Sequence, residues 1–206
     1  MTALAVLDYA SVFIFALTGA LVASRAQLDL VGFVFVGCLT AVGGGTVRDV
    51  ILDRGVFWVA EPSFIMVATA AAFCVFFTAH LLESRLKAIF WLDAVALAVA
   101  VPAGVAAALG MNALWPVVVI MGVATGCFGG LMRDVVCNEV PLVLKQGELY
   151  VTCALAGAAS SLALLSLGQP LGLALIGCAT VTFGLRAGSL AFGWRLPVYK
   201  SRPPRR

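Results

Sequence analysis

The sequence has 206 residues, of which 63% are hydrophobic and 11% are charged, and its mean hydropathy is +1.09. Soluble domains carry about 25% charged residues, so this composition excludes a soluble globular protein and indicates an integral membrane protein. The length accommodates about seven helical spans of about 20 residues each, which leaves no room for a separate soluble domain. We therefore expect one transmembrane domain over residues 1–206.

Charges and turn residues divide the chain into seven apolar runs. Two of the boundaries contain no charge and depend on turn residues alone, Gly110-Met111-Asn112 and Gly168-Gln169-Pro170. The sequence thus predicts an all-α integral membrane protein with seven transmembrane helices. The runs cover residues 6–24, 30–54, 62–82, 88–109, 113–137, 147–167 and 170–192.

Basic residues are distributed unequally between the two sides of the predicted bundle. The connections after the first, third and fifth spans share a side with the C-terminus and collect most of the Lys and Arg, whereas the opposite side has only Arg48 and Arg54. The positive-inside rule then predicts a cytoplasmic C-terminus and an N-terminus outside. For the basic tail, residues 193–206, a solvated segment that sets topology is favoured over a lipid anchor.

The two halves of the chain resemble each other at a fixed offset of 85 residues. Asp8 corresponds to Asp93, and Gly44-Gly45 corresponds to Gly129-Gly130, without a gap. Each half contains three helices, an odd number, so the second copy enters the membrane from the opposite side. The expected organisation is a 3+3 inverted repeat, with repeat one at about 5–84, repeat two at about 90–168, and a seventh helix at about 170–192.

Glycines interrupt the second and fifth spans at comparable depth, near the middle of the membrane. The first set is Gly43, Gly44 and Gly45, followed by Thr46, and the second is Gly129 and Gly130. Glycine weakens a helix by about 1 kcal/mol per residue relative to alanine. Unwound backbone at this depth is tolerated only where it is buried in protein or lines a wet cavity. We therefore expect broken helices with an aqueous ion pathway between them, although glycines that only permit close packing would leave the same pattern.

Each glycine set is followed by Arg-Asp-Val, at Arg48-Asp49 and at Arg133-Asp134. Because side chains at i and i+1 do not face each other on a helix, we expect pairing across the pseudo-twofold, Arg48 with Asp134 and Arg133 with Asp49, as part of a pore or gate. The alternative is that these residues snorkel to the interface and cap helix ends.

A second acidic pair, Asp8 and Asp93, lies near the starts of the first and fourth spans. Either a pore vestibule or complementation of the helix dipole explains it. No catalytic motif and no set of metal ligands is present, with His80 the single histidine. We therefore expect no enzymatic activity, no cofactor, no metal site and no binding of nucleic acid.

The duplicated glycine-rich segments followed by Arg-Asp-Val, in three-helix repeats with a seventh helix, resemble the trimeric intracellular cation (TRIC) channel family in its bacterial branch. The resemblance covers about residues 5–192, with Phe128 in place of the first glycine of the second triplet. It implies a homotrimer in the bacterial inner membrane with one potassium-permeable pore per protomer, in contact with membrane lipids. The phosphoinositide-linked Lys-Glu-Val motif of animal members is missing, because residues 104–116 carry no charge.

Two functions of different class remain after the resemblance. A passive cation channel needs a continuous wet path for potassium or sodium ions. A secondary transporter of a small solute such as glycine needs closure around a bound substrate. Since no duplicated aromatic or hydroxyl cluster suggests a pocket for an organic substrate, the sequence favours the channel.

Overall fold

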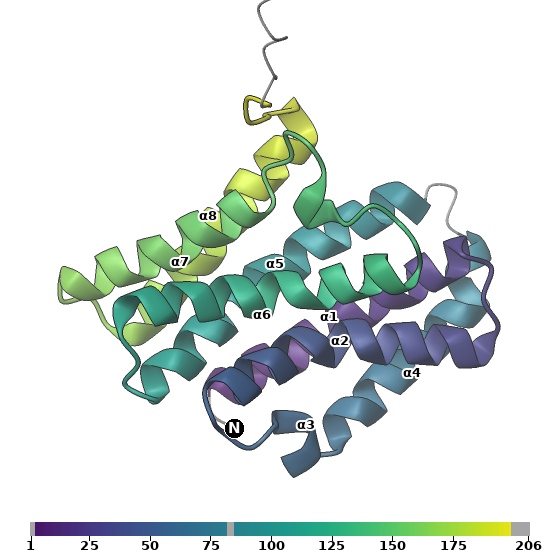
Figure 1. Ribbon diagram of the computed structural model, residues 1–206, viewed down its shortest axis with the longest axis horizontal. Coiled ribbons are helices and arrows are strands. Elements are labelled where there is room, and N and C mark those ends of the chain that lie inside the picture. The colour runs from purple at the N-terminus through teal and green to yellow at the C-terminus, as the bar shows by residue number, and fades with distance from the viewer. Residues whose placement is uncertain (1–2, 82–84, 199–206) are drawn as a thin grey trace, which may run out of the picture.

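The computed structural model describes residues 3–81 and 85–198, and its long helices run alongside one another in a bundle (Figure 1). Six of these helices are long and apolar enough to cross a membrane, and α7 is a shorter apolar helix. The predicted all-α fold is thereby confirmed. The long helices are α1 (Ala3–Arg25), α2 (Leu30–Ile51), α4 (Ser63–Thr78), α5 (Arg85–Gly110), α6 (Trp115–Val136), α7 (Val151–Ser166) and α8 (Leu171–Phe192).

Short elements connect some of the long helices. They are α3 (Phe57–Ala60) and the 3-10 turns η1 (Ala79–Leu81) and η2 (Leu142–Leu144). The sequence did not predict them, because each contains only three or four residues and lacks a periodic pattern of its own. The far end of the predicted basic tail, residues 199–206, lies outside the described residues.

Local backbone geometry repeats at the 85-residue offset. Gln27 and Asn112 have positive φ values of 55° and 52°, and Asp53 and Asn138 have positive φ values of 50° and 54°. Left-handed backbone is uncommon outside glycine and ends a helix. The same unusual conformation therefore stops the first and second helices of both repeats, as an internal duplication predicts.

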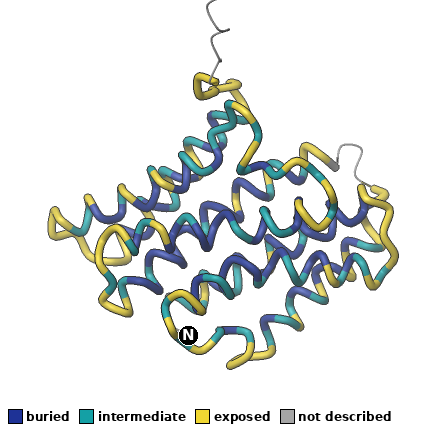
Figure 2. Tube along the Cα trace, in the orientation of Figure 1, coloured by how far each residue is buried: buried dark blue, intermediate teal, exposed yellow. Residues whose placement is uncertain are grey.

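Four helices form the centre of the bundle. α1 packs against α2 and α5, and α6 packs against α2 and α5, so the helices contact one another in a closed ring. α4 covers α1 and α2 on one side, while α7 covers α6 and α8 packs on α5 and α7. Figure 2 shows buried residues along the inner faces of these helices. The functional candidates on α1, α2, α5 and α6 thus belong to the innermost layer.

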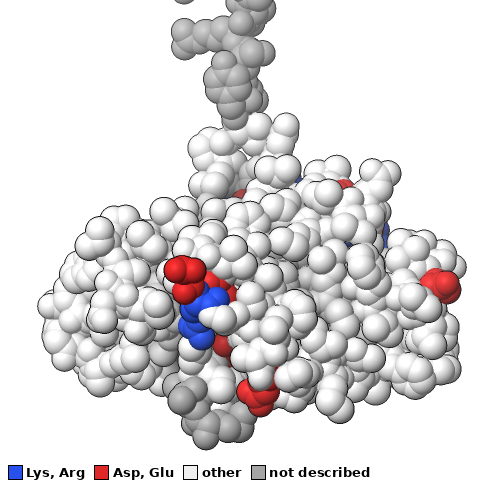
Figure 3. Space-filling model, turned by 60° about the horizontal axis from the view of Figure 1, so that its bottom comes forward, with Lys and Arg blue, Asp and Glu red and all other residues white. Residues whose placement is uncertain are grey.

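The outer surface agrees with a membrane environment. Figure 3 brings forward the side of the bundle that lies at the bottom in Figure 1, and it shows a largely uncharged surface on which a basic group lies between acidic ones. Large apolar side chains such as Val31, Met66 and Ile176 are exposed on the protein. Lipid is a favourable solvent for such side chains, whereas water is not.

Candidate functional site

The glycines of α2 do not interrupt the helix. α2 runs without a break from Leu30 to Ile51, and α6 runs without a break from Trp115 to Val136. The predicted unwound segments are therefore wrong. A helix tolerates glycine when tertiary packing stabilises it by more than the low helix propensity of glycine costs. Here α2 and α6 pack against each other.

The glycines instead let α2 and α6 approach closely. A Cβ placed on Gly44 would overlap the carbonyl oxygen of Thr125, and one placed on Gly129 would overlap the carbonyl oxygen of Thr40. These two contacts exchange under the 85-residue offset, so they lie on either side of the pseudo-twofold. Small residues at such crossings allow the backbones of membrane helices to pack directly.

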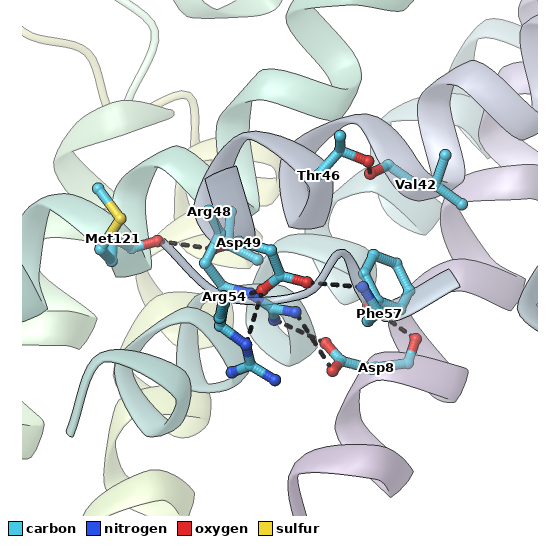
Figure 4. A network of polar contacts seen from close by, with 10 residues as sticks. Asp8, Val42, Thr46, Arg48, Asp49, Arg54, Phe57 and Met121 are labelled. Carbon is cyan, nitrogen blue, oxygen red and sulfur yellow. Dashed lines mark hydrogen bonds and ion pairs between the residues drawn. The ribbon is translucent and has the colours of Figure 1, made fainter. Parts of the chain in front are cut away.

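The first charge cluster consists of Asp8, Arg48, Asp49, Arg54 and the backbone N–H of Phe57 (Figure 4). Nη1 of Arg48 lies 2.8 Å from Asp8 Oδ1, and its Nε lies 2.8 Å from Asp49 Oδ1. The Phe57 N–H donates to Asp49 Oδ2 at 2.9 Å, and Nε of Arg54 lies 3.4 Å from Asp49 Oδ1. The cluster ties α1, α2 and α3 together at one end of the bundle.

The second charge cluster consists of Asp93, Arg133, Asp134, Thr18 and the backbone N–H of Leu142. Arg133 lies 2.9 Å from Asp93 and 2.8 Å from Asp134, and it donates to the Thr18 hydroxyl at 3.0 Å. The Leu142 N–H donates to Asp134 Oδ2 at 2.9 Å. The cluster repeats the first one at the other end of the bundle and ties α5, α6, η2 and α1 together.

The predicted pairing across the pseudo-twofold is wrong, because each arginine binds the two carboxylates of its own repeat. α2 and α6 run in opposite directions, so Arg48 and Arg133 lie beyond the glycine crossing on opposite sides, about 18 Å apart along the helix axes. Adjacent residues on a helix point in different directions, yet Arg48 pairs with Asp49 and Arg133 pairs with Asp134. The arginine side chain is long enough for its Nε to reach the next carboxylate.

Burial excludes the interfacial alternative for both arginines. Arg48 and Arg133 are each 0% exposed, as are Asp49 and Asp93. A snorkelling side chain keeps its charge in water, and these charges are inside the protein. Asp8 and Asp93 also lie beyond the first turns of α1 and α5, so their role here is to pair with arginine rather than to complement a helix dipole.

Small polar side chains continue inward from the first cluster. Asp8, Ser11, Thr40 and Thr125 line a small cavity of about 10 Å³ between the four central helices. This volume is near the minimum for one water molecule. Thr18 on α1 and Asp93 on α5 lie outside this cavity and both accept hydrogen bonds from Arg133 in the second cluster. We call Asp8, Ser11, Thr40, Thr125, Thr18 and Asp93 the polar column.

The remaining predicted pathway residues have packing contacts. A Cβ on Gly43 would meet the Met132 sulfur, and one on Gly45 would meet the Phe57 ring. The Thr46 hydroxyl accepts from Trp58 Nε1 at 2.9 Å, on the α3 side of α2. Gly130 faces the second cluster with ordinary van der Waals space for a Cβ.

Several residues near the site were not predicted from the sequence. Thr18 binds Arg133, and Arg186 on α8 is 0% exposed, pairs with Glu148 at 2.7 Å and lies over the Tyr150 ring. The charge pattern of the sequence marks Arg186 only as one of the basic residues on the side of the C-terminus. The signal available was its place inside an apolar run, where an arginine is costly unless it is paired.

The arrangement provides buried ion pairs and hydroxyls but no set of metal ligands. In the described part of the chain, no three or more His, Cys, Asp or Glu side chains are grouped in a way that could hold a metal ion. The fold and the site define an α-helical membrane protein built from two inverted three-helix repeats, with duplicated charge clusters and a polar interior.

Sequence comparison places the chain in a family. The model of the family described as "Glycine transporter" matches residues 5–80 and 90–166, which correspond to the two repeats. The "UPF0126 inner membrane protein YadS" of Escherichia coli K12 is 36% identical over 199 residues, covering 94% of each chain. The membrane protein YvgT of Bacillus subtilis is 31% identical over 94% of its length and 93% of this chain. The chain therefore belongs to this family.

Solved structures show the same fold. The TRIC trimeric intracellular cation channel orthologue from Rhodobacter sphaeroides is 43% identical and superposes with a TM-score of 0.90, covering 94% of this chain and all of that one. Another TRIC cation channel is 27% identical with a TM-score of 0.86, over 98% of this chain and all of that one. The resemblance to TRIC channels inferred from the duplicated motif is confirmed.

Proposed function

We propose that the protein is a cation channel, not an enzyme, and that potassium ions pass through each protomer between α2 and α6. The observation that carries the proposal is the polar column, whose hydroxyl and carboxylate oxygens are buried inside an apolar bundle, four around one small cavity and two at Arg133. Oxygen ligands are those that hard cations prefer. The similarity to solved TRIC channels supports the same class of function.

The column is closed in this conformation. Its cavity of about 10 Å³ holds at most about one water molecule, and the backbones of α2 and α6 touch where Gly44 meets Thr125. Conduction therefore requires these two helices to separate. The charge clusters at the two ends brace the helices during this movement, because each arginine is held by two carboxylates.

The protein assembles as a homotrimer in the bacterial inner membrane, with the N-terminus outside and the C-terminus in the cytoplasm. Trimerisation follows the solved TRIC orthologue, which is described as trimeric, and the location follows the relative described as an inner membrane protein. The excess of Lys and Arg on the C-terminal side supports the orientation. Permeant ions are the only ligands that this function requires.

Glycine transport is the alternative, favoured by the description of the matching family. A glycine zwitterion needs one group for its carboxylate and another for its amine. Arg48 and Asp8 are charges of the right kind, but they already bind each other at 2.8 Å, and the adjoining cavity is too small for an amino acid. The channel is therefore the better supported function.

Electrical recording and solute uptake by the purified full chain test the proposal. Planar bilayers should show unitary potassium currents, and proteoliposomes should show no saturable glycine uptake. Saturable uptake without unitary currents would reject the channel in favour of the transporter.

Isosteric variants locate the pathway. Thr40→Val and Thr125→Val remove hydroxyls that bond only to carbonyls of their own helices, so the fold should persist. We expect each to reduce potassium conductance about fivefold, as for loss of about 1 kcal/mol of polar interaction. Thr180→Val is the matched control, because its hydroxyl has the same type of bond on an exposed face. Equal conductance in all three variants would place the pathway elsewhere.

A further inference from the structure

An apolar groove runs along the outside of the bundle between α6 and α7. It has a volume of about 270 Å³, and Ile120, Val123, Phe128, Leu131 and Leu155 are among its lining residues. From Ile120 to Leu131 it extends about 16 Å along α6 at 1.5 Å per residue. This length matches the hydrocarbon depth of one leaflet, about half of a 30 Å core.

A polar pocket adjoins the groove at one end. The pocket has a volume of about 500 Å³, and Val143 and Val151 line both the groove and the pocket, so the two are adjacent. Its polar lining comes from Lys145, Gln146, Glu148 and Thr152. The pocket therefore begins where the apolar groove reaches the end of α6, on the side of the membrane that carries the excess of basic residues.

The charge of the pocket lining favours an anion. Glu148 is paired with the buried Arg186 at 2.7 Å, whereas Lys145 has no carboxylate partner among the ion pairs of the described residues. The Lys145 ammonium lies 5.1 Å from the ring centroid of Phe90 on α5, a residue that lines neither cavity. Lys145 is therefore the cation of the pocket that is free to pair with a phosphate.

We propose that the groove between α6 and α7 and the adjoining Lys145 pocket form a binding site for an anionic phospholipid, with an acyl chain in the groove and the phosphate beside Lys145. The apolar groove has the depth of one leaflet and adjoins a pocket that carries Lys145, so it matches the acyl chain and the phosphate of such a lipid. The site lies outside the polar column and does not depend on the proposed channel function.

A second apolar groove on the protein has no basic residue in its lining and serves as a comparison. Ile65, Met66, Ala70 and Phe73 on α4 line an apolar groove of about 450 Å³. No basic residue lines it, so it offers no place for a phosphate. Any lipid there is expected to bind without preference for a charged headgroup.

Native mass spectrometry of the purified full chain tests the site. The protein is titrated with phosphatidylglycerol and with phosphatidylcholine of the same acyl chains. We expect tighter binding of phosphatidylglycerol, and Lys145→Gln should weaken it about fivefold, as for loss of about 1 kcal/mol per basic residue near the lipid surface. Lys87→Gln is the matched control, because Lys87 is exposed and lines neither cavity. Equal effects of the two lysine variants would overturn the proposal.

Val123→Trp fills the groove and should weaken both lipids, whereas Ala70→Trp in the α4 groove should leave phosphatidylglycerol binding unchanged. If the Val123 variant does not fold, Lys145→Gln carries the test by itself. Displacement of the lipid by equimolar glycerol 3-phosphate would overturn the acyl-chain part of the site. Loss of the oligomer in Val123→Trp with lipid binding intact would show that a second copy of the chain, not a lipid, covers the groove.

Discussion

The two charge clusters share one design but differ in charge. In both, an arginine binds the aspartate 40 residues before it and the aspartate directly after it. The second aspartate also accepts a hydrogen bond from the backbone N–H eight residues after it. The first cluster adds Arg54, which approaches Asp49 at 3.4 Å. Glu139 stands at the equivalent position of the second repeat and pairs with Arg25 instead.

This substitution changes the electrostatic balance at the two ends of the polar column. The first cluster has two carboxylates and two guanidinium groups. The second has Asp93 and Asp134 with Arg133 alone, so it has one negative charge in excess. The Thr18 hydroxyl oxygen also accepts a hydrogen bond from Arg133. Ala103 stands at the position equivalent to Thr18 and has no hydroxyl to offer Arg48. The duplicated parts therefore hold the bundle together, while the unduplicated parts distinguish one mouth of the column from the other.

Replacing the buried arginine of each cluster should give the largest difference in stability between the two clusters. Arg133→Met leaves two buried carboxylates without a cation, and we expect it to lower the free energy of unfolding by about 3 to 5 kcal/mol. Arg48→Met should cost less, because Arg54 still pairs with Asp49. Thermal unfolding of both variants in one detergent measures the order. Arg25→Met is the control, because its pair with Glu139 is one-third exposed and is worth at most about 1 kcal/mol. A larger loss for Arg48→Met would contradict the comparison.

Substitution of the crossing glycines should have an intermediate effect. Gly44→Ala and Gly129→Ala place a methyl group against a carbonyl oxygen of the other helix, and we expect each to cost about 1 to 3 kcal/mol through overpacking. The measurement is again thermal unfolding. Gly184→Ala is the matched control, because nothing lies within 4 Å of its added Cβ, and it should be neutral or stabilising by up to about 1 kcal/mol.

These glycine variants also separate two views of the glycine segments. If the glycines serve only as flexible joints, Gly44→Ala and Gly129→Ala should reduce ion flux while leaving stability at the level of Gly184→Ala. The close contact between α2 and α6 predicts the opposite order, with a clear loss of stability. Retained stability in both variants would therefore revive the broken-helix interpretation.

The sequence predicted most of the fold because the relevant signals are local or periodic. Hydropathy located the helices within a few residues of the observed bounds, and the 85-residue offset located the repeats. The ends were less accurate. The second span was expected to reach residue 54, but α2 ends at Ile51, before the left-handed Asp53. A single residue at positive φ leaves little trace in hydropathy.

The site was harder to predict because its contacts are distant in sequence. Asp8 and Arg48 were both selected as candidates, but nothing in their spacing of 40 residues shows that they pair. The glycines lie where α2 crosses α6, so their presence reflects close packing of the two helices and not the predicted break. Thr18 and Tyr150 have no duplicated partner, so a search by repeat offset misses them.

The smallest expected effect belongs to the residue that makes the clusters unequal. Arg54→Gln removes the second cation of the first cluster and gives both clusters the same formal charge. The Arg54 side chain is 27% exposed and lies 3.4 Å from Asp49, so screening by solvent should limit the cost to between about 0 and 1 kcal/mol, and high salt should reduce it further. Unfolding at low and high ionic strength measures this effect, with the exposed Arg195→Gln as control. A salt-independent loss as large as that of Arg48→Met would mean that Arg54 is a full partner in the buried pair, and the two ends of the column would then differ in the strength of their bracing as well as in charge.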